Sequence, residues 1–330
     1  MKIFKETPSF DFIGRRKMYF AFSAILIAAS AFTLVTKGIN WGIDFTGGSV
    51  VQVSFTQSTT LEELRSMLKA SGYKDAIPQR FTGTDSFQIR IKTMESETAD
   101  TADLFVKEFQ AEVGADKFIV DKKEFVGPTV GRHLYKQAVF AVLFSMIAIV
   151  GYVAFRFSNP LWGIAGILAL AHDVCVILGL ISVLGMEFDL VLVAAVLTTA
   201  GYSINDSIVI FDRMREKLRT MRRETLAEVL NVSVNETLSR TLITSLTTFF
   251  TVLTLALIGG TVIHDFAISL VVGVVIGTYS SVGLCGSLVY AWTNRPKMSV
   301  SASASSSDKK PNAGAGERQK GKRARRRKNA

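Results

Sequence analysis

Long uncharged apolar stretches alternate with short polar ones along this chain, and the pattern predicts membrane-spanning helices. A helix needs about 20 apolar residues to cross the hydrocarbon core of a bilayer. Six stretches reach about this length: 18–35, 137–155, 241–263 and 266–294 contain no charged residue, 161–186 contains Asp173 beside His172, and 190–211 contains Asp206. We therefore predict spans at 18–36, 134–155, 161–184, 188–211, 239–260 and 265–292.

The largest hydrophilic block, residues 37–133, separates the first two predicted spans, and its local patterns predict a small α+β domain. Alternating or β-rich runs predict strands, and Thr60 with Glu63 forms a capping box that predicts a helix start. The expected elements are a strand at 49–55, a helix at 60–70, a hairpin of 77–82 and 87–92 across Gly83-Thr84-Asp85, a helix at 95–113 and a strand at 118–126. The order βαββαβ is that of a ferredoxin-like unit. We interpret the block as an interaction module, because it contains no Cys and no His before His133.

The placement of Lys and Arg predicts the orientation in the membrane. These residues gather in segment 1–17, in a basic loop predicted at 212–238 and in the tail 293–330, whereas the short turns after the third and fifth spans contain none. Basic residues in short loops remain on the cytoplasmic side. We therefore expect both termini in the cytoplasm, the block 37–133 outside it, and a multi-pass protein of the cell inner membrane.

The net charge of +10 does not indicate DNA binding, because the basic residues flank the spans. Much of this charge lies in the tail, a Ser/Ala-rich and then Arg/Lys-rich sequence that predicts disorder. Contact with anionic lipid or with the ribosome is one interpretation of the tail, and a solvated topology signal is the favoured alternative.

Several chemistries are not indicated by the sequence. Its two cysteines, Cys175 and Cys285, both lie in apolar stretches, without metal-ligand spacing. There is no G-x-x-x-x-G-K-[ST] phosphate-binding motif. We expect no cofactor, no metal site and no catalytic residues, and hence not an enzyme.

Ionisable residues inside the spans are the main candidates for function, since each costs about 2.5–3.5 kcal/mol to insert. Asp206 and Arg240 are equally far along the chain from residue 223, which lies near the centre of the basic loop between the fourth and fifth spans. They are therefore expected at the same membrane depth, close enough to interact if their helix faces match. A proton relay and a static ion pair are both compatible with this spacing.

Other polar positions support this pair. Thr244, Thr247 and Thr251 recur with Arg240 at helical spacing, and predict either a polar lining or hydrogen bonds between helices. Asp173 ranks below Asp206, and the neighbouring His172 is expected to point about 100° away from it. Gly273 and Gly277, in G-x-x-x-G spacing, predict close helix packing.

An ordered set of motifs from residue 10 to about residue 292 resembles the SecD/SecF family of protein-export membrane proteins, on its SecF side. The motifs are Phe10-Asp11-Phe12, Gly42-Ile43-Asp44-Phe45-Thr46-Gly47-Gly48, Val126-Gly127-Pro128, His172-Asp173, Gly201-Tyr202-Ser203-Ile204-Asn205-Asp206, Leu238-Ser239-Arg240-Thr241 and Gly277-Thr278-Tyr279-Ser280-Ser281. Their number and order make the resemblance more specific than any single motif.

The resemblance implies a six-span half of a pseudo-symmetric unit, related to the resistance-nodulation-division transporters and completed by a SecD chain. It implies association with the SecYEG channel and with the translocating preprotein, and proton-driven movement of the outer domain. It places Asp206 and Arg240 on the proton path, with Asn205 in the same motif and Gly42, Asp44, Gly47 and Gly48 in a second family motif.

Two other functions are weighed against this one. A half-unit of another proton-coupled transporter of the superfamily is disfavoured, because such proteins usually carry larger outer domains and both six-span sets in one chain. A scaffold without transport has little reason to bear buried Asp206 and Arg240. The coupling ion stays open between H⁺ and Na⁺, since a buried carboxylate near hydroxyl groups suits either.

Overall fold

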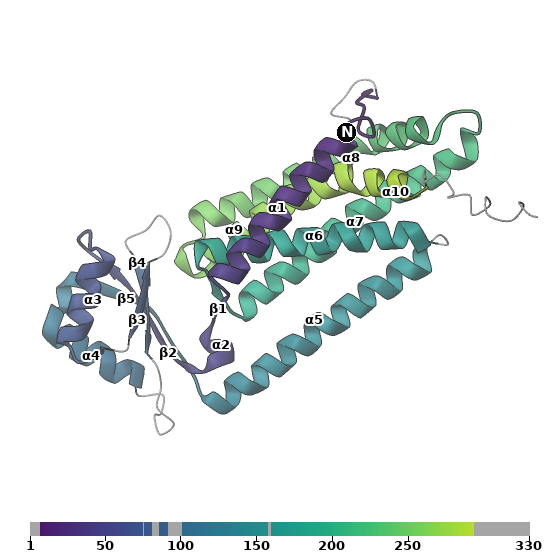
Figure 1. The fold of residues 1–330 in the computed structure, drawn as a ribbon. Helices are drawn as coiled ribbons and strands as arrows, with labels where there is room; N and C mark the ends of the chain where they lie inside the picture. The colour runs from purple at the N-terminus through teal and green to yellow at the C-terminus, as the bar shows by residue number, and fades with distance from the viewer. Residues whose placement is uncertain (1–6, 75, 81–85, 92–100, 158–159, 294–330) are drawn as a thin grey trace, which may run out of the picture. The chain divides into compact units, whose positions relative to one another are not determined.

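The computed structural model describes residues 7–74, 76–80, 86–91, 101–157 and 160–293. Within these ranges, six helices are long and apolar enough to cross a membrane (Figure 1). They are α1 (Arg16–Thr36), α5 (Pro128–Arg156), α6 (Pro160–Leu184), α7 (Leu190–Thr220), α8 (Leu226–Ile258) and the last helical stretch, in which α9 (Thr261–Tyr279), η2 (Ser280–Cys285) and α10 (Gly286–Thr293) follow one another. Six predicted spans are thus confirmed.

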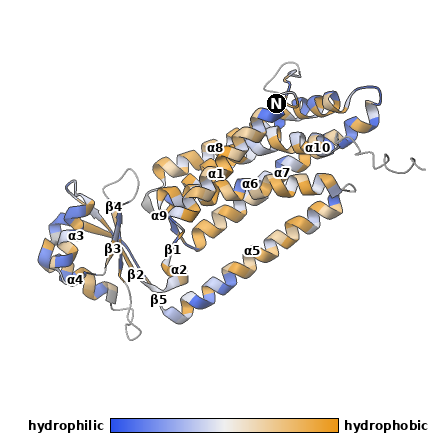
Figure 2. Cartoon of the chain, viewed as in Figure 1, coloured by the Kyte–Doolittle hydropathy of each residue, from blue (hydrophilic) through white to orange (hydrophobic). Residues whose placement is uncertain are grey.

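Apolar residues predominate along the long helices (Figure 2). Phe32, Phe144 and Phe155 are among many large apolar side chains left exposed. A water-soluble protein rarely exposes so much contiguous apolar surface, whereas a lipid-facing helix must. The surface therefore agrees with a chain solvated by lipid.

The segment predicted as a basic loop, 212–238, is mostly helical, which corrects that boundary. Helix α7 continues to Thr220, and α8 begins at Leu226 after a capping box of Thr225 and Glu228. The segment contains neither Gly nor Pro to end a helix. Similarly, α5 begins at Pro128, inside the block assigned to the outer domain, because proline suits the first position of a helix.

The outer block folds as the predicted ferredoxin-like α+β domain. Its strands β2 (Gly48–Phe55), β3 (Ile77–Arg80), β4 (Ser86–Ile91) and β5 (Phe118–Val126) form one antiparallel sheet in the order β3-β4-β2-β5. Helices α3 (Leu61–Ala70) and α4 (Thr101–Val113) cover one face of the sheet (Figure 1). Leu64, Phe87, Phe105 and Phe109 are fully buried between them.

The local details of this domain and of the segments next to it agree with the sequence analysis to different degrees. The capping box of Thr60 and Glu63 is formed. The turn at 81–85 and the predicted helix start at 95 lie outside the described residues. A short parallel pair of β1 (Asn40–Trp41) and β6 (Glu187–Phe188) was not predicted, because two-residue strands leave no periodic signal.

Helix α9 packs closely against α7, as the G-x-x-x-G spacing predicted. A Cβ atom at Gly273 would lie 2.5 Å from Thr199 Oγ1, and one at Gly277 would lie 3.1 Å from Ser203 Cβ. Only glycine permits this approach, which brings the hydroxyl groups of α7 next to the last helical stretch. That stretch then forms a π-helical turn, η2.

Candidate ion-coupling site in the membrane helices

Asp206 lies on the buried face of α7, where it is 4% exposed. Its Oδ2 atom is buried and has no hydrogen-bond partner in the described part of the chain. A buried carboxylate oxygen without a donor is costly when the group is charged. The site is therefore chemically suited to taking up a proton or a cation.

Arg240 lies on α8 with an exposed side chain. The positive charge of Arg240 interacts with the Asp206 carboxylate. This interaction agrees with the prediction that the two residues lie at the same depth in the membrane. Between these two described residues, however, the structure contains neither a hydrogen bond nor an ion pair within 4 Å. The two groups are thus electrostatic neighbours rather than a closed salt bridge.

The predicted supporting residues around this pair face outward. Asn205, Thr244 and Thr247 are exposed, and both threonine hydroxyls donate to carbonyl groups of their own helix. The interhelical hydroxyl contact is made instead by Ser245, which accepts from Tyr202 Oη at 3.1 Å and Thr278 Oγ1 at 2.7 Å. The sequence analysis missed Ser245, although it is polar and faces the opposite side of the helix from the threonines.

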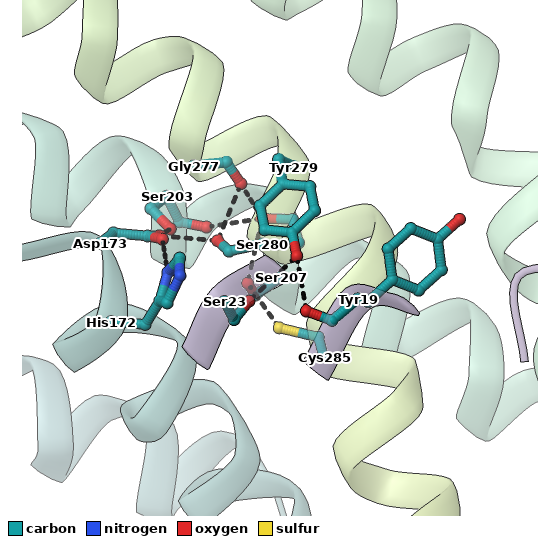
Figure 3. A network of polar contacts seen from close by, with 11 residues as sticks. Tyr19, Ser23, His172, Asp173, Ser203, Ser207, Gly277, Tyr279, Ser280 and Cys285 are labelled. Atoms are coloured by element: carbon teal, nitrogen blue, oxygen red, sulfur yellow. Dashed lines mark hydrogen bonds and ion pairs between the residues drawn. The ribbon is translucent and has the colours of Figure 1, made fainter. Parts of the chain in front are cut away.

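Asp173 on α6 is completely buried at the centre of a polar network (Figure 3). Its Oδ2 atom accepts hydrogen bonds from Ser203 on α7 at 2.5 Å and from Ser280 on η2 at 2.7 Å. Its Oδ1 atom lies 2.9 Å from His172 Nδ1. His172 was expected to point about 100° away from Asp173, and side-chain torsions nevertheless bring the polar atoms of these adjacent residues within hydrogen-bonding distance.

The network continues to two other elements (Figure 3). Tyr279 Oη donates to the Tyr19 carbonyl of α1 at 2.8 Å and lies 3.0 Å from Ser23 Oγ. One helical turn from Ser203, Ser207 Oγ lies 3.2 Å from both Ser281 Oγ and Cys285 Sγ. Polar contacts therefore run through α1, α6, α7, α9 and η2.

The glycine motif of 42–48 lies at the end of the helices next to the α+β domain and has a structural role. Gly42 N donates to the Phe188 carbonyl, and Asp44 Oδ2 accepts from Leu190 N at 3.0 Å, at the start of α7. Gly47 and Gly48 have φ angles of +72° and +129°, which other residues rarely adopt. A Cβ atom at Gly47 would also lie 3.1 Å from Pro128 Cα. The motif thus fixes the exit of α1 against the starts of α5 and α7.

Acidic groups gather beside this motif. Glu187 and Asp189 lie in the α6–α7 connection, and burial raises the pKa of both carboxyl groups, that of Asp189 to about 6. The charges of Asp44 and Glu187 add to the effect on Asp189. In the described part of the chain, no group of three or more His, Cys, Asp or Glu is arranged to hold a metal ion.

Two family models match the chain. Residues 106–295 match the C-terminal region of the protein-export membrane proteins SecD and SecF, and residues 32–59 match the SecD/SecF GG motif. The protein translocase subunit SecF of Calditerrivibrio nitroreducens is 42% identical over 88% of this chain and 96% of the relative. The subunit SecF of Vibrio alginolyticus is 41% identical over 87% and 91%.

A solved structure agrees with these matches. The crystal structure of the translocon-associated membrane protein SecDF from Thermus thermophilus superposes with a TM-score of 0.79 at 39% identity. The match covers 89% of this chain and 40% of the SecDF chain. This protein is therefore a transport protein rather than an enzyme, and it belongs to the SecD/SecF family as a protein translocase subunit of the SecF type.

Proposed function

We propose that this translocase subunit works with SecD in the cell inner membrane and uses the proton-motive force to promote the late export of preproteins. Asp206 is the proton carrier in this proposal, and Arg240 is the cation that helps it release the proton. The observation that carries the proposal is the buried Asp206 carboxylate, whose Oδ2 has no donor and whose electrostatic neighbour is Arg240.

The exposed polar strip of α7 and α8 supports the partnership with SecD. Asn205, Arg240, Thr244 and Thr247 are exposed on helices that are long enough to span the membrane. An arginine facing lipid costs about 2.5–3.5 kcal/mol, so a partner helix in place of lipid stabilises this face. The relatives named SecDF carry a longer chain, of which this one matches 40%, and a SecD chain is the natural occupant.

The remaining parts of the proposal rest on the sequence. The basic segments favour cytoplasmic termini, and the outer α+β domain then faces the emerging preprotein. The SecYEG channel and membrane lipids are the further expected partners. The tail, which lies outside the described residues, is proposed to act as a topology signal, with anionic lipid or the ribosome as its alternative contacts.

Reconstitution tests this function directly. Vesicles containing SecYEG, the translocation ATPase and SecD are prepared with and without this chain, and preprotein translocation is measured with and without a proton gradient. We expect the gradient to stimulate translocation only when this chain is present and to observe that SecD co-purifies with it. Equal stimulation without the chain would contradict the proposal.

A further inference from the structure

His172 and Asp173 form a closed acid–base pair that the proposed Asp206 path leaves unused. Both side chains are buried, with exposed fractions of 2% and 0%, and their Nδ1 and Oδ1 atoms lie 2.9 Å apart. Asp173 Oδ2 already accepts two serine hydroxyls. The carboxylate therefore has donors on both oxygen atoms, and three of its neighbours come from different parts of the helical bundle.

Charge balance limits the protonation states of this pair. With one shared proton beyond neutral imidazole and carboxylate, the pair is neutral overall, either as His⁺ with Asp⁻ or as neutral His with protonated Asp. Without that proton, a net negative charge lies in the buried part of the helix bundle, which is energetically costly. The pair is therefore a site that holds one proton and responds strongly to its loss.

The groups around the pair provide no compensating cation. Among the described residues, His172 is the one group within 4 Å of the Asp173 carboxylate that can carry a positive charge. The titratable groups near the pair are Tyr279, whose ring centroid lies 6.2 Å from that of His172, Tyr19 behind it on α1, and Cys285 on η2. None of these carries a positive charge in any protonation state.

The second imidazole nitrogen of His172, Nε2, is the atom of the pair that can exchange a proton. His172 Nε2 is buried and has no hydrogen-bond partner among the residues that the structure describes. If Nδ1–H donates to Asp173, Nε2 is a free basic atom that can accept a proton from water. Protonation there leaves the Nδ1–H bond to Asp173 intact and adds one charge to the pair.

We propose that His172 and Asp173 together form a second proton-binding site of this subunit, which rests on the ion-driven function proposed above. Water supplies the proton to His172 Nε2, and release returns it to water, with no other bond made or broken. Loss of the proton removes the positive charge beside Asp173 and leaves its carboxylate with the hydrogen bonds from His172 Nδ1, Ser203 and Ser280 alone, so the contact between α6, α7 and the π-helical turn follows the occupancy of the site. Hydroxyl donors lie at Oδ2 and the imidazole Nδ1 lies at Oδ1, and a carboxylate surrounded by donors fits a proton better than an alkali cation.

Histidine NMR tests the site without any transport assay. The chain contains three histidines, so ¹⁵N-histidine-labelled protein in lipid nanodiscs gives few imidazole signals, and loss on His172→Gln assigns one of them. We expect that signal to titrate with pH, to show the neutral form protonated at Nδ1, and to move in Asp173→Asn. An imidazole signal that is insensitive to pH while the protein stays folded, or one that responds to Na⁺ and not to pH, would overturn the proposal.

Transport then separates this site from the Asp206 path. The neighbouring pair His264 and Asp265 is a matched control, because its side chains are 23% and 28% exposed and 3.4 Å apart. We expect His172→Gln to reduce gradient-dependent translocation about fivefold or more and to shift its pH profile, whereas His264→Gln retains both. Wild-type stimulation that persists unchanged in His172→Gln would overturn the second site alone. Stimulation that persists in Asp206→Asn would instead contradict the proposed function.

Discussion

Arg90 of the outer α+β domain forms an ion pair with Glu187, which lies in the connection between α6 and α7. The same carboxylate accepts hydrogen bonds from Gln88 on β4 and from Ile43 N in the glycine motif. One side chain therefore joins the sheet of the outer domain, the segment after α1 and the start of the helix that carries Asp206. This contact therefore connects the α+β domain to the segment from which the helix of the proposed ion site begins.

Breaking this ion pair from one side is expected to destabilise the fold. Arg90→Met leaves Glu187 buried without its cation, at a cost of about 3 kcal/mol, whereas the double variant Arg90→Met/Glu187→Gln removes the unpaired charge and recovers part of that stability. Thermal unfolding of the purified variants measures the coupling. Additive effects of the two substitutions would show that the pair does not connect the two parts.

Close packing of α9 on α7 predicts an effect of adding one methyl group. Gly273→Ala places a Cβ atom 2.5 Å from Thr199 Oγ1, and overpacking of this kind costs about 1–3 kcal/mol. Gly151→Ala on α5 is the matched control, since its Cβ atom meets nothing within 4 Å. The melting temperature is expected to fall for Gly273→Ala only. Equal melting temperatures for the two variants would contradict the packing.

The buried carboxyl group of Asp189 predicts a pH dependence of stability. Its pKa is raised to about 6, first by burial and then by the charges of Asp44 and Glu187. The folded protein therefore binds this proton between about pH 4 and 6 while the unfolded chain releases it, so stability falls as pH rises through this window.

Substituting the Asp189 carboxyl group by an amide tests the sign of this pH dependence of stability. Asn keeps the cap on Leu192 N, which Asp189 Oδ1 accepts at 2.7 Å, and it carries no charge. At pH 7.5 we expect Asp189→Asn to have a higher melting temperature than the wild type, because its free energy of unfolding rises by up to about 3 kcal/mol. Its stability is also expected to depend less on pH between pH 4 and 6. A lower melting temperature at pH 7.5, relative to the exposed control Asp116→Asn, would show that the charge is stabilising.

Asn231 holds the N-terminal segment against α8. Its Oδ1 atom accepts from Phe12 N at 3.0 Å and Ile13 N at 2.9 Å, and its Nδ2 donates to Asp11 Oδ1 at 2.8 Å. Asn231→Ala removes these bonds, each worth about 1 kcal/mol.

Trypsin reports on this segment, because Arg15 and Arg16 follow it directly. Cleavage after these residues is expected to be several times faster in Asn231→Ala than in the wild type or in Gln137→Ala, an exposed position on α5. An unchanged rate would mean that burial of Ile13 and the two hydrogen bonds between Asn235 and Phe10 hold the segment without Asn231.

Much of this fold was predictable because its signals are long and periodic. Six apolar stretches and the βαββαβ pattern follow directly from hydrophobicity and from one capping box at Thr60. Helix ends were less predictable, since the basic segment 212–238 is polar and yet contains nothing that ends a helix. The β1–β6 pair depends on contacts between residues about 147 positions apart, which no local pattern encodes.

The site was predictable in its ionisable residues but not in its contacts. Ionisable residues are costly to place inside a membrane span, so the few that occur there could be identified from the sequence as functional candidates. These residues are Asp173, Asp206 and Arg240. Which hydroxyl meets which carboxylate depends on helix rotation, so Thr244 and Thr247 were favoured although Ser203, Ser245 and Ser280 make the interhelical bonds. The π-helical turn that presents Ser280 has no sequence signature of its own.

The central claim is that Asp206 carries the ion, and one translocation measurement tests it most directly. Vesicles with SecYEG, SecD and either wild-type protein, Asp206→Asn or the exposed control Asp116→Asn are compared with and without an imposed proton gradient. Asn is nearly isosteric with Asp but cannot release a proton, so the gradient-dependent part of translocation is expected to disappear in Asp206→Asn and to persist in Asp116→Asn. Undiminished stimulation in Asp206→Asn, with SecD still bound, would contradict the account and leave Asp206 a structural residue.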